Sequence, residues 1–182
     1  KQYVLRISGL GDRCEEDYLA ETEFVHYLAE NGAPVADVIP SVKGNLVECE
    51  EWEDEKNYIS LFAYAKGMLI CDNGYRYREG ASLEEYFYNT GKALGAIHRL
   101  SKAFVPSHHR THYVEKYNMA AINSLIPDTY SALKDAIAQR LEHFAALPMD
   151  ADCYGLLHFD FSDGNYHIDM NKPFKELSEY EK

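Results

Sequence analysis

The chain has 182 residues, 46% of them hydrophobic, and its 30 acidic residues outnumber its 18 basic ones to give a net charge of −12. This excess of acid argues against nucleic acid as the main partner, since phosphate binding needs clustered Lys and Arg. It is compatible with a cationic substrate. No apolar run is long enough to span a bilayer, and no basic-then-apolar leader opens the sequence. We therefore expect a cytoplasmic protein without a membrane partner, with enough apolar residues for one core or two small ones.

In chain order, residues 2–8 form an apolar, partly alternating run that predicts a strand. Residues 15–31 then show helical spacing, and Gly32 is placed to end that helix. The positions on one stripe of the helix are Tyr18, Thr22, Val25 and Leu28/Ala29. We expect this stripe to face the core.

Glu21 lies on the edge of the same stripe, one turn before Val25. A carboxylate that faces a core needs a partner, and Arg6 on the preceding strand is the natural candidate. The alternative is that Glu21 is a solvated helix residue, a description that fits Glu23 on the polar side better. We predict an ion pair between Arg6 and Glu21.

Two further strands are predicted at about 45–49 and 58–65. The acidic segment 50–57 between them is expected to be a solvated loop, so that the two strands form a hairpin. This segment suggests no function of its own.

The tripeptide Ala65-Lys66-Gly67 ends the sheet pattern, and the chain after it has mostly helical spacing. We therefore predict a boundary here. A sheet-and-helix part would cover 1–65 and a mainly helical part would cover 66–182.

The helical part begins with a capping box at Ser82 and runs as one helix to about residue 101. Gly91 and Gly95 in this helix predict the close approach of another element. A later helix is predicted over 128–146. Its inward positions would be Leu133, Ile137, Leu141 and Phe144.

Three histidines, His108, His109 and His112, lie within five residues and could bind a transition metal. No pair of them lies on a confidently predicted element, and we favour a simply exposed loop. A metal hydrolase that combines these histidines with His158 and Asp160 is a remote alternative.

The strongest chemical signal is a histidine, an aspartate two residues later and an asparagine five residues beyond it: His158, Asp160 and Asn165. This is the spacing of the kinase catalytic loop. Phosphoryl transfer needs an oxygen base beside the attacking hydroxyl and an oxygen ligand for magnesium. The alternative is a polar turn between two strands. We favour function because Phe159 and Phe161 flank Asp160 and could anchor it with buried rings.

Taken together, these segments resemble the aminoglycoside phosphotransferase and choline kinase-like family, the small-molecule branch of the protein-kinase-like fold. The likeness rests on five segments in the right order: 3–7, 21–35, 61–67, 91–100 and the loop 158–165.

The resemblance implies that Asp160 orients or deprotonates a substrate hydroxyl and that Asn165 ligates Mg²⁺. From the loop itself we expect His158 to brace it by hydrogen bonding rather than to take part in the chemistry. It further implies that Arg6, braced by Glu21, contacts the phosphates of ATP or GTP.

The segment 61–67 resembles the hinge of this family. The resemblance implies that backbone groups of Phe62, Ala63 and Ala65 hold the adenine ring.

The expected fold is α+β and two-lobed, with a nucleotide-binding N-terminal lobe and a helical C-terminal lobe. The family's glycine-containing hairpin and its later metal-binding Asp motif are not found, so we expect the sequence to be incomplete at both ends. The predicted function is ATP- and Mg²⁺-dependent phosphorylation of a hydroxyl on a small molecule, aminoglycoside-, choline- or homoserine-like. The alternative is a catalytically inactive kinase-like module that binds nucleotide or a partner. The oligomeric state is not predicted.

Overall fold

The computed structural model describes residues 1–170 apart from 10, 12 and 79. The chain forms two compact units. The first unit comprises Lys1–His108 with Leu156–Lys182, and the second unit comprises His109–Gly155. The lobe boundary at residue 65 stays a prediction, and residues 171–182 of the predicted helical lobe lie outside the described residues.

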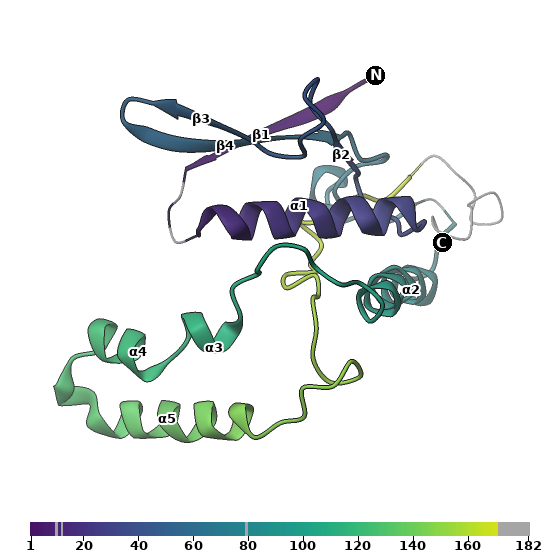
Figure 1. Cartoon of the computed structure of the whole chain (residues 1–182). Coiled ribbons are helices and arrows are strands. Elements are labelled where there is room, and N and C mark those ends of the chain that lie inside the picture. Colours follow the sequence, from purple (N-terminus) through teal and green to yellow (C-terminus); the bar gives the residue numbers. More distant parts are fainter. Residues whose placement is uncertain (10, 12, 79, 171–182) are drawn as a thin grey trace. The chain divides into compact units, whose positions relative to one another are not determined.

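The first unit contains a four-stranded antiparallel sheet (Figure 1). Its strands are β1 (Tyr3–Gly9), β2 (Val38–Ile39), β3 (Glu48–Trp52) and β4 (Glu55–Ala63). The long strand β4 lies in the centre: β1 pairs along one edge, while β2 and β3 pair with successive parts of the other edge. This arrangement places Arg6 on β1 opposite Ser60 on β4.

The hairpin between β3 and β4 corrects the expected acidic loop. Trp52 pairs with Glu55, so the turn consists of Glu53 and Asp54 alone. Both residues have positive φ, 52° and 64°, as the tight turn of a two-residue hairpin requires. The charged residues form strands here because their side chains lie on exposed faces of an edge ribbon, where charge costs little.

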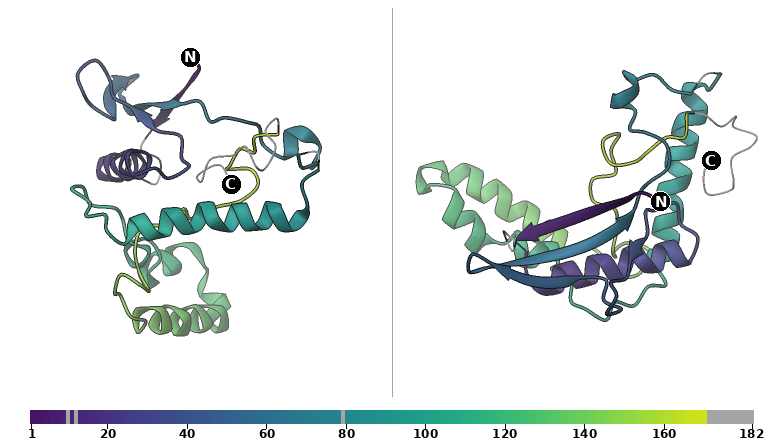
Figure 2. Two further views of the ribbon diagram at one scale, coloured as in Figure 1. Left: turned by 90° about the vertical axis from the view of Figure 1, so that its right-hand side faces the viewer. Right: turned by 90° about the horizontal axis from the view of Figure 1, so that it is seen from above.

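Helix α1 (Glu15–Glu30) is buried on two sides. Toward the sheet, the ring of Tyr18 stacks on Tyr58 of β4 at 4.8 Å between centroids. On another side, Phe24 and Leu28 join the core that α1 shares with α2 (Leu83–Ser101). Figure 1 shows α1 lengthwise and α2 end-on, and Figure 2 shows the reverse in its left view, so the two helices cross. The predicted single stripe was therefore incomplete, since it left out Phe24.

In α2, the predicted cap is present: Ser82 Oγ accepts a hydrogen bond from the Glu85 N–H at 3.1 Å. Among the described residues, α2 contributes Ile97 and Leu100 to the buried core, both from its second half. The close approach predicted at Gly91 and Gly95 is wrong. A Cβ added at either glycine would meet no described atom within 4 Å.

The second unit contains α3 (Tyr113–Lys116), α4 (Met119–Leu125) and α5 (Ser131–Ala145). The helix predicted over 128–146 is confirmed, but two of its expected inward residues, Leu133 and Phe144, are about half exposed. Lys134 is buried instead, and its Nζ contacts the Asp128 carboxylate at 2.5 Å. Over the described part of the chain, no helix has the length and apolarity needed to cross a membrane.

The segment after β4 is tied to the segment after the His158–Asn165 loop by a short backbone bridge. The Met68 N–H donates to the Ile168 carbonyl at 3.0 Å, and the Ile168 N–H donates back at 2.8 Å. Gly67 makes this possible. Its φ is +79°, and a Cβ there would lie 2.2 Å from the Ile168 oxygen.

The Gly67→Ala substitution should destabilise the protein by about 2–4 kcal/mol, since it adds a left-handed backbone cost to a steric clash with backbone. Gly91→Ala is the matched control and should stabilise by roughly 0.5–1 kcal/mol, because Ala is the better helix former and the site is open. Urea unfolding of both variants measures the difference, and equal free energies of unfolding would contradict the bridge.

Glu23 is not the solvated residue that the sequence suggested. Its carboxylate accepts hydrogen bonds from Ser107 Oγ at 2.6 Å and from the Ser107 N–H at 3.1 Å, and it lies 3.2 Å from His108 Nδ1. Partial burial by itself raises the pKa of Glu23, but the hydrogen bonds from Ser107 and His108 outweigh it and lower the pKa below the ordinary value of 4.5. The contact fixes the chain after α2 onto α1.

Because the folded pKa of Glu23 lies below the unfolded one, its contribution to stability is complete above about pH 4.5 and is lost as the pH falls through the folded pKa. Glu23→Gln should therefore flatten the acid side of the stability–pH profile. Glu50→Gln, on exposed β3, serves as the control. Thermal unfolding between pH 3 and 7 tests this, and parallel profiles for wild type and Glu23→Gln would refute it.

Candidate functional site

The loop that carries the predicted catalytic residues is held by the side chain of Asn165. Its Nδ2 donates to the Asp160 backbone carbonyl at 2.8 Å and to the Asp160 carboxylate at 2.9 Å. The Asp160 side chain remains 74% exposed. The Asn165 side-chain oxygen accepts no hydrogen bond from the described residues. The loop thus presents a carboxylate and an amide oxygen, both of which are ligands that Mg²⁺ prefers.

His158 supports the loop in a different way from the one expected. Its Nδ1 lies 3.7 Å from the Asp160 carboxylate, too far for a hydrogen bond, and this buried nitrogen has no partner among the described residues. The ring instead packs edge-on against Phe161 at 5.3 Å. The expected hydrogen-bonded brace is therefore replaced by ring packing.

One of the two phenylalanines beside Asp160 anchors the loop. Phe161 packs against the core shared by α1 and α2 and stacks on Tyr166 at 4.9 Å, and the Tyr166 hydroxyl contacts that of Tyr86 on α2. Phe159 is 87% exposed, so its expected anchoring role is wrong. In a fully extended segment these two residues would share a face, but residues 159 and 160 form a turn, which directs Phe159 away from the core that Phe161 reaches.

The predicted Arg6–Glu21 pair is confirmed. Arg6 Nη1 lies 2.5 Å from Glu21 Oε1, and the second oxygen of the same carboxylate lies 2.6 Å from Arg13 Nη1. No sequence pattern had singled out Arg13. Two guanidinium groups thus share one carboxylate, which leaves one positive charge uncompensated within this group of three in an otherwise acidic protein.

Arg6 is oriented from a second side by Phe62, whose ring lies 4.9 Å from its guanidinium carbon. Phe62 is the diagonal neighbour of Arg6 across the β1–β4 pairing, which brings the two side chains to the same face. Arg6 Nη2 is buried and has no hydrogen-bond partner among the described residues. An unsatisfied buried donor of this kind fits an anionic ligand such as a phosphate oxygen.

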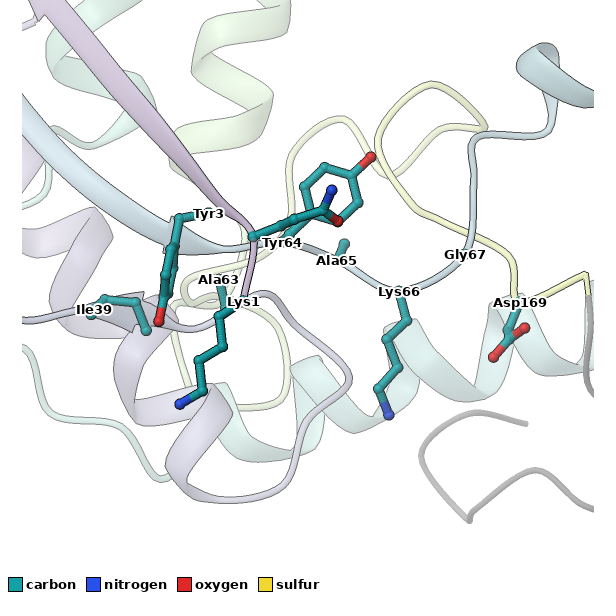
Figure 3. A pocket seen from close by; sticks show the side chains of 10 residues that line it. Lys1, Tyr3, Ile39, Ala63, Tyr64, Ala65, Lys66, Gly67 and Asp169 are labelled. Carbon is teal, nitrogen blue, oxygen red and sulfur yellow. The ribbon is translucent and has the colours of Figure 1, made fainter.

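An open pocket of about 620 Å³ lies beside the predicted hinge (Figure 3). Residues from the start of β1, from β2, from the hinge and from the end of the described chain line it. They include Tyr3, Ile39, Ala63, Ala65, Lys66 and Asp169. The Ala63 N–H donates to the Asp37 carbonyl at 2.8 Å, whereas the Ala65 peptide has no hydrogen-bond partner among the described residues. Within the described part of the chain, the backbone groups of Ala65 thus remain open to a ligand.

The structure places the predicted residues in three groups within the first unit: Asp160 with Asn165, Arg6 with Glu21, and the hinge around Ala65. Within the described part of the chain, no hydrogen bond or ion pair joins the first group to the second. The sequence indicated neither that Arg13 contacts Glu21 nor that Asp169 lines the hinge pocket.

The small antiparallel sheet, the crossing helices and the His-x-Asp loop define a protein-kinase-like α+β fold. Solved structures support this class. One, titled "Amicoumacin kinase hAmiN in complex with AMP-PNP, Ca2+ and Ami", superimposes with a TM-score of 0.75 at 22% identity over 91% of this chain and 48% of its own. Another, a microcompartment-associated aminopropanol kinase, gives a TM-score of 0.65 at 18% identity over 95% of this chain and 55% of its own.

The sequence profile of the Phosphotransferase enzyme family matches residues 1–175, and the chain belongs to this family. It is 26% identical to amicoumacin kinase of Bacillus subtilis (strain 168) over 174 residues, 93% of this chain and 49% of the relative. It is also 27% identical to an uncharacterized protein of Synechocystis over 145 residues, 80% of this chain and 36% of the relative. The chain therefore spans half or less of the length of these curated relatives.

Alanine substitutions should show that Phe161 and Phe159 contribute differently to stability. We expect Phe161→Ala to lower the free energy of unfolding by roughly 2 kcal/mol, less than a fully buried Phe because the ring is half-buried. Phe159→Ala should change it by less than about 0.5 kcal/mol. Denaturant unfolding provides the comparison, and a larger loss from Phe159→Ala would mean that the loop is anchored differently.

Proposed function

We propose that this chain provides the nucleotide-binding and catalytic-loop parts of a kinase that transfers the γ-phosphoryl group of ATP to a hydroxyl of a small molecule. The observation that carries the proposal is the Asn165 amide holding an exposed Asp160 carboxylate. In this role Asp160 accepts the hydroxyl proton, or orients the hydroxyl for attack, as phosphoryl transfer requires.

Arg6 would bind the nucleotide phosphates. Glu21 and Phe62 fix its guanidinium from two sides, and its buried Nη2 lacks a partner among the described residues. A fixed cation beside the phosphates stabilises the charge that develops during transfer. Arg13, on the other oxygen of Glu21, keeps this region positive.

The Asn165 side-chain oxygen would ligate a divalent cation, which when bound neutralises charge on the phosphates. Oxygen donors suit Mg²⁺, and a related amicoumacin kinase structure contains AMP-PNP and Ca²⁺. The open Ala65 peptide beside the hinge pocket would hold adenine through its backbone groups.

The acceptor would be a small alcohol that also carries an amine. By their names, the related kinases act on amicoumacin and on aminopropanol. A net charge of −12 suits a cationic acceptor because the field of the protein attracts it.

The test uses the full-length protein with Mg²⁺, γ-labelled ATP and a panel that includes aminopropanol and amicoumacin. Asp160→Asn should lower transfer by about 10²–10⁴-fold and keep the thermal stabilisation by Mg²⁺ and ATP. Arg6→Ala should lose most of that stabilisation. Asp163→Asn, in the same loop, is the matched control and should retain activity.

Two results would overturn the proposal. Full transfer by Asp160→Asn would remove the catalytic role of this carboxylate. Thermal stabilisation by nucleotide without transfer to any acceptor would instead favour the inactive, nucleotide-binding module.

A further inference from the structure

A second cluster of chemically active side chains lies at the start of the second unit, outside the kinase-like site. His109, His112 and Glu115 are spaced three residues apart, and one ligand atom from each lies within 4.8 Å of the others. Among the described residues, no other group of three or more His, Cys, Asp and Glu side chains lies close enough together to share a metal ion. The sequence grouped His108 with them, but His108 contacts Glu23 in the first unit.

Local backbone structure holds the three side chains together. His112 precedes the first turn of α3 and Glu115 lies within it, with the Glu115 N–H donating to the His112 carbonyl at 3.0 Å. The rings of His109 and His112 are nearly parallel, 8° apart, with centroids at 5.7 Å. His109 Nε2 lies 2.9 Å from the Glu115 carboxylate.

Tyr154 orients one of the imidazoles. Its hydroxyl lies 2.7 Å from His112 Nδ1, which leaves His112 Nε2 as the ligand atom. Tyr154 itself packs beside Tyr113 at 6.1 Å, and Tyr113 packs edge-on against Phe144 of α5. A hydrogen bond from the second ring nitrogen is how metal-binding histidines are usually fixed.

We propose that His109, His112 and Glu115 bind a zinc ion, with water in the fourth position. Two imidazoles and one carboxylate form a ligand set that zinc accepts in tetrahedral geometry. Imidazole nitrogen also disfavours Mg²⁺ and Ca²⁺, which take oxygen ligands. The ion would fix α3 to the segment that precedes it, and this role is independent of phosphoryl transfer.

A simple hydrogen bond between His109 and Glu115 is the competing explanation of the 2.9 Å contact. It requires an N–H on His109 Nε2 and has no need of His112 or Tyr154. A metal requires a bare nitrogen on each imidazole, and removing either histidine would then weaken binding. The two explanations therefore differ in what His112 contributes.

The experiment titrates Zn²⁺ into the full-length protein by calorimetry and Co²⁺ by visible absorption, both without nucleotide. We expect one equivalent of each metal to bind. His109→Ala, His112→Ala and Glu115→Gln should each weaken Zn²⁺ binding at least 10-fold. Tyr154→Phe should weaken it about 10–100-fold.

His143→Ala is the matched control, an exposed histidine of the same unit outside the cluster. Circular dichroism verifies that each variant is folded, and Glu115→Gln suffices if a histidine variant is not. No stoichiometric binding, or equal binding by His112→Ala and wild type, would overturn the proposal. The experiment measures metal binding and not kinase activity, so a protein without kinase activity would still test the zinc site.

Discussion

The burial of α1 on two sides is the constraint on which the rest of the first unit depends. On one side Tyr18 stacks on β4, and on the other Phe24 and Leu28 form the core with α2. The first contact sets the helix beside β1, where Glu21 meets Arg6. The second forms the apolar surface on which Phe161 anchors the catalytic loop. One helix thus positions both the cationic group and the carboxylate loop.

The backbone bridge at Gly67 adds a second constraint, between segments that are far apart in the chain. It joins the end of the hinge to the strand-like segment after Asn165, so the hinge pocket is lined by Asp169 as well as by Ala65. Only a residue without a Cβ, and with positive φ, allows the two backbones to approach so closely. Gly91 and Gly95 of α2 show no such close contact with any of the residues that the structure describes.

Local patterns predicted several elements correctly. The strand of Arg6, the helix of Glu21 and the cap at Ser82 follow from spacing and capping chemistry. The acidic hairpin was missed because charged residues can occupy an exposed ribbon, where propensity matters less than pairing. The stripe on α1 was incomplete because a helix buried on two sides has no single apolar face.

The sequence by itself determined the chemistry of the candidate site: Asp160 and Asn165 at kinase spacing, and a carboxylate on α1 that needed a cation. These depend on residue type and short separations, which the chain fixes locally. The tertiary structure decided which neighbours complete them: Arg13 on Glu21, ring packing instead of a hydrogen bond for His158, and Phe161 rather than Phe159 as the anchor. Such choices depend on which side chains of distant segments meet, and only packing in three dimensions determines that.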